Sequence, residues 1–307
     1  MDVSVLRVKD YSAQEIKHGV SQSLDYFGVK DDLKGVNSVL IKPNLCYYWD
    51  YSTGETTDPR FVSCIIEYIR LHHPDINITI GEADASAMRT RHAYKILGYE
   101  KISKEYCVPL INLSDGTWVS EKVSINGIDL DLPISKTFSH FDYIINVPKL
   151  KTHPSTGMTC SMKNIYGAIA KPYKFPYHKN LAEVIVGINE IIHTDINIVD
   201  GIICRGKYPK KIGIILTGRD AFKTDLIAAK LMGFNPAEIK YLKLKLDLLN
   251  RKRFPEISIH EVNICIDDVI RDFPKVSHTQ EIVMRNVLIP LIKLYAKVSG
   301  DQAPFEI

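Results

Sequence analysis

The feature that most limits how this chain can fold is an alternation of short β-rich segments with amphipathic helical segments over the first 150 of its 307 residues. Within Ala13–Phe27, Ile16 and Val20 recur on one face at helical spacing. Asp58 followed by Pro59 is typical of a helix N-terminus, where aspartate caps and proline takes the first position. The predicted strands are Val3–Val8, Ser38–Leu45, Ile76–Asp84, Val108–Leu113 and Phe141–Leu150, and a third helix is predicted over Ala87–Tyr106. Strands that alternate with helices of this length indicate βαβ units, so we predict an α/β fold with a Rossmann-like, mainly parallel sheet and helices on both faces.

Later segments add an antiparallel hairpin insertion and a smaller C-terminal part. Asn126-Gly127 lies between two alternating runs, which is a strong signal for a two-residue hairpin turn. The further predicted elements are helices over Asn180–His193 and Ala221–Phe234, the latter capped by Asp220 and Asp225, strands over Asn197–Ile203 and Ile212–Thr217, and, beyond Glu256, one strand and a helix broken or kinked at Pro290. We divide the chain into an α/β domain over residues 1–250, which carries the site, and an extension over residues 251–307 packed on it.

Composition excludes several classes of protein. No apolar run approaches the roughly 20 residues that a membrane-spanning helix needs, and the N-terminus has the pattern of a strand rather than of a signal peptide. We therefore expect a cytoplasmic protein without a membrane partner. The six cysteines show no C-x-x-C spacing, so neither zinc nor an iron–sulfur cluster is expected. We expect reduced thiols in the core, with Cys160 set apart because it lies in a basic segment.

Polar residues follow three of the predicted strands at their carboxyl ends. Ligands of open α/β sheets bind beyond such strand ends. The second strand ends in Lys42 and Asn44, and its loop supplies Thr56 and Thr57 at the start of a helix, whose free N–H groups attract anions. The third strand ends near Glu82. The fifth ends in the sequence PKLKTH, which contains Lys149, Lys151 and His153.

Charge is segregated along the chain. The 40 residues from Tyr143 to Ala182 contain no Asp or Glu but six lysines, so this window carries +6 while the whole chain carries +3, which leaves −3 for the rest (3 − 6). These lysines lie among small, apolar and turn residues rather than along one polar helical stripe, and few carboxylates are close to them in sequence. The pattern favours a pocket for a small anion over a solvated basic face.

Nucleic acid is a second partner that a basic segment can indicate. Tyr166, Tyr173, Phe175 and Tyr177 interleave with lysines, as base stacking would require. However, the same window contains no arginine, which removes the bidentate contacts to phosphate and guanine. Together with the nearly balanced net charge, this makes a nucleic-acid partner the weaker interpretation.

The basic segment also offers groups for proton transfer. His153 and His178 are candidate acid–base groups, and the pKa values of Lys151 and Lys163 would fall if several cations share one pocket. Pro154 disfavours a helical conformation at His153, so that Lys151 and His153 are predicted to project to the same side of an extended chain. Asp200 follows another predicted strand and can orient a lysine or histidine, or hold a metal.

Several ordered motifs carry a resemblance to a known family. They are VLIKPNL at Val39–Leu45, TTDP at Thr56–Pro59, IGEAD at Ile80–Asp84, IINVPKLKTHPSTGMTCSMKNIYG at Ile144–Gly167, IVDG at Ile198–Gly201 and GRDAFKTD at Gly218–Asp225. With these motifs the chain resembles the domain-of-unknown-function family 362, in which many members carry an additional ferredoxin-like module with two four-cysteine motifs. This sequence has no such module, and after Gly201 it departs from the Gly-Pro pair that the family pattern usually contains. More distantly, TTDP beside a Rossmann-like half is similar to the N-terminal part of nickel-dependent lactate racemases, which keeps 2-hydroxy acids among the candidate substrates.

The leading hypothesis is an enzyme of the isomerase, epimerase or lyase type that acts on a small carboxylate- or phosphate-bearing metabolite. The alternatives are a non-catalytic protein that binds or senses an anion and a redox partner that uses an iron–sulfur centre of another subunit. The candidate residues are His153, Lys151 and His178 for catalysis, Lys42, Asn44, Thr56, Thr57, Lys149, Lys163 and Asn164 for anion binding, and Glu82 and Asp200 for orienting a cation or holding a metal. The sequence identifies no substrate, cofactor, metal requirement or oligomeric state.

Overall fold

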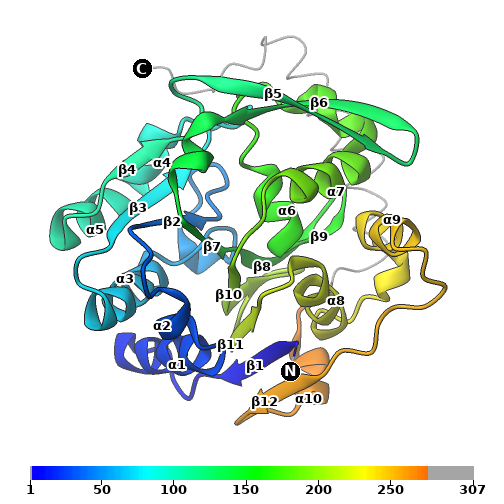
Figure 1. Cartoon of the computed structure of the whole chain (residues 1–307). Helices are drawn as coiled ribbons and strands as arrows, with labels where there is room; N and C mark the ends of the chain where they lie inside the picture. The colour runs from blue at the N-terminus through cyan, green and yellow to red at the C-terminus, as the bar shows by residue number, and fades with distance from the viewer. Residues whose placement is uncertain (1, 276–307) are drawn as a thin grey trace.

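The centre of the protein is a ten-stranded, mostly parallel sheet (Figure 1). The computed structural model describes residues 2–275. The strands are β1 (Val3–Arg7), β2 (Ser38–Pro43), β3 (Asn77–Glu82), β4 (Leu110–Asn112), β7 (Tyr143–Val147), β8 (Lys149–His153), β9 (Gly157–Thr159), β10 (Ile196–Arg205), β11 (Pro209–Gly218) and β12 (Ile259–Val262). Their order is β12-β1-β11-β10-β7-β2-β3-β4, with β8 paired to β10 and β9 paired to β8.

The parallel part of this sheet runs from β10 to β4 through β7, β2 and β3. β11 is antiparallel to both β10 and β1, so the first strand of the chain lies outside the parallel block. Strands that are covered on both faces are apolar without alternation, and all five residues of β7 are buried. The predicted α/β class with a mainly parallel sheet is confirmed.

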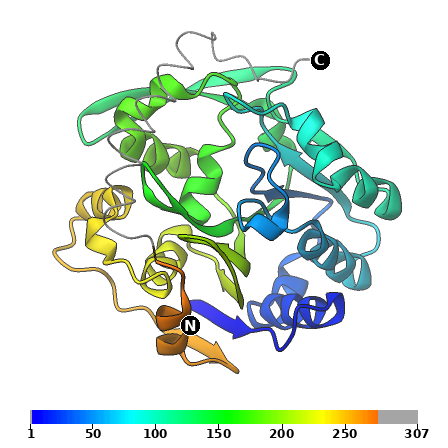
Figure 2. The ribbon, with the colours of Figure 1, turned by 180° about the vertical axis from the view of Figure 1, so that it is seen from behind.

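Helices cover both faces of the sheet (Figures 1 and 2). They are α1 (Ala13–Tyr26), α2 (Val29–Asp32), α3 (Pro59–His72), α4 (Thr90–Ile96), α5 (Tyr99–Tyr106), α6 (Ser161–Tyr166), α7 (Leu181–Ile191), α8 (Ala221–Leu231), α9 (Lys240–Leu248) and α10 (Ile266–Asp272), with short 3₁₀ segments η1 (Tyr51–Thr53), η2 (Lys136–His140), η3 (Phe175–Asn180) and η4 (Pro236–Glu238). Because side chains alternate along a strand, neighbouring residues of β2 belong to different cores. Leu40 packs with the core of α6, α7 and α8, whereas Ile41 packs with the core of α1 and α3.

Local sequence signals explain two of the boundaries. The Asp58 side chain accepts a hydrogen bond from the Arg60 backbone N–H, and Pro59 opens α3, as predicted. The single helix predicted over Ala87–Tyr106 is wrong, because the chain forms α4 and α5 on either side of Gly98. Gly98 has a φ of 83°, a left-handed conformation that ends a helix and that glycine adopts at little cost.

The predicted hairpin is confirmed as β5 (Trp118–Ile125) and β6 (Ile128–Ser135). Asn126 and Gly127 have φ angles of 52° and 74°, the pair of positive values that a type I′ turn requires. The hairpin lies over α7 (Figure 1), and a Cβ added to Gly187 of α7 would lie 3.0 Å from both Leu130 and Val123. The two-stranded sheet is therefore separate from the main sheet and covers one of the apolar cores.

The predicted fifth strand, Phe141–Leu150, divides in two. β7 pairs with β2 and β10, but after Pro148 the chain continues as β8, which stays beside β10 and pairs on its other side with β9. Pro148 has no N–H to donate to a ladder, while its carbonyl oxygen accepts a hydrogen bond from the Asp200 N–H at 2.9 Å. The extended conformation predicted for Lys151 and His153 is thus confirmed, and these residues belong to β8, a strand separate from β7.

The division at residue 250 stays a prediction. Beyond that point, β12 pairs in parallel with β1 and so joins the main sheet, while the helix predicted around Pro290 lies outside the described residues. No helix within residues 2–275 has the length and apolar character that crossing a membrane would need.

Candidate functional site

Two buried ion pairs lie at the carboxyl ends of the parallel strands. The first joins β2 to β3: Lys42 Nζ lies 2.8 Å from Glu82 Oε1, and the two side chains are 0% and 4% exposed. Glu82 also accepts hydrogen bonds from the backbone N–H groups of Leu45 and Ala83. Lys42 is therefore neutralised within the protein, and three donors already contact the carboxylate.

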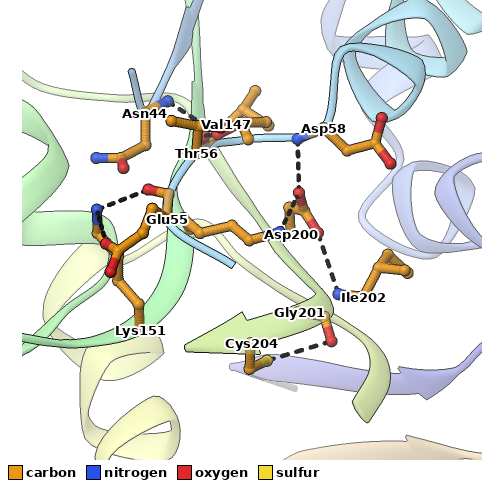
Figure 3. Close-up of polar contacts among 12 residues, drawn as sticks. Asn44, Glu55, Thr56, Asp58, Val147, Lys151, Asp200, Gly201, Ile202 and Cys204 are labelled. Atoms are coloured by element: carbon orange, nitrogen blue, oxygen red, sulfur yellow. Dashed lines mark hydrogen bonds and ion pairs between the residues drawn. The ribbon is translucent and has the colours of Figure 1, made fainter. Parts of the chain in front are cut away.

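The second pair joins β8 to β10. Lys149 Nζ lies 2.7 Å from Asp200 Oδ2, with side chains 1% and 0% exposed. The same carboxylate accepts the N–H of Asp58 at 2.8 Å and the N–H of Ile202 at 3.0 Å (Figure 3). Asp200 thus fixes the loop that leads into α3 against β10, and Lys149 balances its charge.

The threonines and amides form the wall between these pairs. Thr57 Oγ1 donates to the Val147 carbonyl and accepts from the Asn44 N–H, while Thr56 Oγ1 donates to the Trp49 carbonyl. Both hydroxyls are therefore used within the fold. Asn44 Nδ2 donates to Asn164 Oδ1 at 2.9 Å, but Asn44 Oδ1 is buried and has no hydrogen-bond partner in the described structure.

Above this layer lies a cavity of about 180 Å³. Its walls come from the loop after β2, from β8, from the segment after β3, from α6 and from η3. The candidate residues that line it are Asn44, Glu82, Lys151, His153, Lys163, Asn164 and His178, and further lining residues include Cys46, Thr159, Tyr166, Lys174 and Phe175. Lys42, Lys149, Thr56, Thr57 and Asp200 do not line it. The structure thus separates the candidates into two groups: the seven residues that line the pocket, and five residues beneath it that form a buried supporting layer.

Lys151 is held at the edge of this pocket by Glu55. Its Nζ donates to the Glu55 carbonyl at 2.6 Å and lies 3.2 Å from the Glu55 carboxylate (Figure 3). Arg205 contacts the same carboxylate at 3.6 Å. Two acceptors of Glu55 therefore hold the Lys151 side chain in place at the pocket edge.

His153 follows Lys151 in extended β8, as predicted from Pro154. Its Nδ1 accepts a hydrogen bond from the Ser155 N–H at 3.2 Å. Desolvation in the pocket wall, followed by the charges of Lys163 and Lys151, holds the pKa of His153 well below its ordinary value of 6.5. A neutral ring whose Nδ1 accepts must carry its proton on Nε2, so His153 offers a neutral N–H donor.

Of the lysines that line the pocket, Lys163 and Lys174 have no carboxylate partner in the described structure. Desolvation and the nearby Lys151 charge lower the pKa of Lys163 to about 8, and its Nζ lies 5.4 Å from the centre of the Tyr166 ring. Lys174 is 5% exposed, and burial lowers its pKa to about 7. A buried ammonium that lacks a counter-ion is costly, which makes these two groups the natural partners of an anion.

Helix α6 places Lys163 and Asn164 in the pocket, and a buried aspartate holds this short helix. Asp220 and Asp225 were both expected to cap α8, which is confirmed for Asp220 and wrong for Asp225. Asp225 lies inside α8, and its carboxyl group instead accepts the N–H groups of Ser161 and Met162 at 2.6 Å and 3.2 Å. Burial raises the pKa of Asp225 to about 7.

The cysteines only partly match the expectation of core thiols. Cys64, Cys160 and Cys204 are buried, whereas Cys107 and Cys265 are exposed and Cys46 is intermediate. Cys204 Sγ contacts the Gly201 carbonyl at 3.4 Å (Figure 3), and burial raises the pKa of Cys160 well above its ordinary value. Within residues 2–275 no three His, Cys, Asp or Glu side chains gather as a metal site would require.

We expect the anaerobically purified protein to contain no iron–sulfur cluster, because none of its cysteines has the required spacing. The measurement is iron and acid-labile sulfide per chain, together with the visible absorption spectrum. Stoichiometric iron and sulfide would contradict this prediction and would favour the redox alternative.

Sequence reasoning did not select Lys174 or Glu55. Lys174 belongs to the acid-free window but lies outside the two lysine motifs, and its proximity to the pocket depends on how the loop before η3 folds. Glu55 stands directly before Thr56 and Thr57, so its position in a polar loop was the available signal.

Comparison with known proteins gives a family and two similar proteins. The family model described as "Domain of unknown function (DUF362)" matches residues 39–230. "Thylakoid-associated protein sll1697" of Synechocystis sp. is 25% identical over 251 residues, which cover 77% of this chain and 76% of that protein. The lactate racemase apoprotein from Thermoanaerobacterium thermosaccharolyticum is similar in structure, with a TM-score of 0.49 and 11% identity over 78% of this chain. This chain spans 57% of the length of that racemase chain.

Proposed function

This chain belongs to the DUF362 family, whose description names no activity, and we therefore propose its function from the pocket itself: an enzyme that binds a small carboxylate- or phosphate-bearing metabolite and transfers a proton on it. The single observation that carries this proposal is the meeting of Lys163 and Lys174 with His153 in one cavity. Neither lysine has a carboxylate partner within residues 2–275. An isomerase, epimerase or lyase needs this combination of an anion anchor and a proton donor.

We assign direct contact with the anion to fewer lysines than the sequence predicted. Lys42 and Lys149 are neutralised by Glu82 and Asp200, so they support the pocket from below. Lys163 is assigned the direct contact, and Lys151 adds positive charge from its place beside Glu55. Asn44 Oδ1, an acceptor in the pocket wall without a partner in the described structure, is suited to a hydroxyl or ammonium group next to the anion.

The proton-transfer step is assigned to the two histidines. His153 presents Nε2–H, which can donate to a ligand oxygen as negative charge develops there. His178 lines the same cavity, with its ring 5.1 Å from that of Phe175, and is the candidate for the second acid–base group. No metal or cofactor enters this assignment.

A second candidate function is favoured by one observation. Because Nδ1 of His153 already accepts the Ser155 N–H, the ring offers the pocket a donor rather than a base, as a non-catalytic anion sensor would also require. The two functions are separated by incubating the protein in D₂O with small 2-hydroxy, 2-amino and 2-oxo acids and following the α-proton by NMR. Loss of the α-proton signal supports the enzyme, and calorimetric binding without exchange supports the sensor.

Removal of the Lys163 ammonium should weaken binding of a small anion. We expect Lys163→Ala to lose roughly 1.5–3 kcal/mol of binding free energy, which is typical of a hydrogen bond to a charged group. In the unaltered protein, affinity should fall as the pH rises through about 8, because the free ammonium then loses its proton. Calorimetry with the D₂O-positive acid, or with phosphate, measures both effects.

Lys179→Ala is the matched control, since Lys179 belongs to the same basic window but is exposed on η3. Its affinity for the anion should equal that of the unaltered protein. A loss as large as that of Lys163→Ala would mean that general positive charge, and not the pocket, binds the anion.

A further inference from the structure

One buried nucleophile in the pocket is not used by the proton-transfer scheme. Lys174 lies in the loop before η3, and its Nζ donates to the Gly167 carbonyl at 2.7 Å. The described structure gives this Nζ no ion pair. The loop itself is tied down, because the Lys174 carbonyl accepts the Tyr166 hydroxyl at 3.1 Å and its N–H donates to Ser86 Oγ. The amine is therefore held in a fixed position in the pocket wall.

Building on the proposed function, we propose that the Lys174 amine forms an imine with the carbonyl carbon of a small 2-oxo acid bound in this pocket. Lys163 would hold the carboxylate of the same molecule. The negative charge of such a ligand matches the Lys163 cation. Its carbonyl group matches the Lys174 amine, which has no carboxylate partner within residues 2–275. The proposal narrows the substrate class from small anions to those that carry a ketone or an aldehyde.

The surroundings of Lys174 favour the free amine that attacks a carbonyl. Burial is the main cause that lowers its pKa to about 7, and the Lys42 and Lys163 charges act in the same direction against Glu82 and Asp84. A large share of the amine is therefore unprotonated at neutral pH. The hydrogen bond to the Gly167 carbonyl uses one N–H and leaves the lone pair free.

Gly167 keeps this arrangement close to the buried layer. A Cβ at this position would lie 3.0 Å from the Asn164 carbonyl, 3.1 Å from Lys42 Nζ and 3.2 Å from Glu82 Oε1. These approaches are tight, so the backbone that accepts from Lys174 packs directly on the Lys42–Glu82 pair. Lys174 is thus connected to the Lys42–Glu82 pair through the backbone of Gly167.

The covalent step balances without a further reactant. The nitrogen lone pair attacks the carbonyl carbon, a C–N bond forms, and the oxygen becomes the hydroxyl of a carbinolamine. The C–O bond then breaks and water leaves, with one proton from the amine and one from a protonated general acid, for which the Lys163 ammonium is available in the same pocket. The product is a protonated imine, which withdraws electrons from a neighbouring C–H or C–C bond, as an isomerase or lyase of this type requires.

Reductive trapping tests this proposal. The full-length protein is incubated with pyruvate or with glyoxylate, reduced with sodium borohydride, and analysed by intact mass and peptide mapping. We expect one reduced adduct per chain, located on Lys174. Its formation rate should rise as the pH increases through about 7, whereas exposed lysines require a pH near their ordinary pKa of about 10.4.

Variants separate the nucleophile from its surroundings. Lys174→Arg keeps a cation that can donate to the Gly167 carbonyl but cannot form the imine, so it should fold, as a thermal melt would show, and lose the adduct. Lys174→Met should also lose it. Lys171→Met, which changes an exposed lysine of the same loop, should keep it.

Two results would overturn the imine. One is an adduct that persists in both Lys174 variants or spreads over exposed lysines; the other is the absence of any adduct with both probes. Calorimetry then measures how tightly the unaltered protein and Lys163→Ala bind the same two probes, which tests the proposed function separately from the imine. If Lys163→Ala binds the probes more weakly than the unaltered protein, the proposed anion pocket is supported and only the imine is wrong. If the variant binds them equally well, both proposals are wrong.

Discussion

Replacement of Asp200 by alanine is expected to lower the free energy of unfolding by about 3–5 kcal/mol, which is typical when one partner of a buried ion pair is removed. The change leaves the Lys149 ammonium, 1% exposed, without its carboxylate at 2.7 Å. It also leaves the N–H groups of Asp58 and Ile202 without their acceptor. Urea unfolding followed by circular dichroism measures the loss as a shift of the midpoint.

A matched control separates this effect from that of deleting any acidic side chain. Asp272→Ala removes the partner of Lys210 in a pair whose side chains are 54% and 36% exposed, and such surface pairs contribute about 0–1 kcal/mol. Adding Lys149→Met to Asp200→Ala should recover part of the loss, because the buried charge is then gone as well. If Asp200→Ala unfolds at the same midpoint as Asp272→Ala, the pair is not the support of the pocket that we describe.

Much of the fold could be predicted from local patterns because the decisive residues are neighbours in sequence. Asp58 and Pro59 predicted the start of α3, and Asn126-Gly127 predicted the turn between β5 and β6. The division of one predicted helix at Gly98 was missed, although glycine near a helix end is a recognised stop signal. The path of β8 was missed because its pairing with β10 and β9 depends on partners that come later in the chain.

The charge pattern predicted the pocket only in part, because ion pairs join residues that are far apart in sequence. Lys42 and Glu82 are separated by 40 positions, and Lys149 and Asp200 by 51. An acid-free window therefore did not mean unpaired lysines: Lys149 and Lys151 of this window acquire carboxylates from other parts of the chain, as Lys42 outside it does. The motif residues Lys151, His153, Lys163 and Asn164 do line one cavity, because β8 and α6 follow each other closely in the chain.

The strongest effect on catalysis is expected from His153. We expect His153→Ala to change ligand affinity within a few-fold and to reduce turnover by roughly 10²–10⁴, the usual contribution of a positioned acid–base group. The assay is the α-proton exchange in D₂O described above. Burial, followed by the charges of neighbouring lysines, keeps the ring neutral by lowering its pKa well below 6.5, so His153 itself should add no titration to the rate between about pH 6 and 7.

His153→Gln distinguishes a proton donor from a group that only binds. Glutamine supplies a neutral N–H in place of the Nε2–H that the Ser155 contact specifies, but it has no ring nitrogen that can take up and release a proton. If His153 transfers a proton, His153→Gln should bind the ligand as the unaltered protein does and exchange α-protons as slowly as His153→Ala. If His153 only holds the anion, alanine should weaken binding by about 1.5–3 kcal/mol, and glutamine should restore both binding and exchange. Full exchange activity in the glutamine variant would therefore assign the proton transfer to another residue, and His178 is the next group in the pocket to replace.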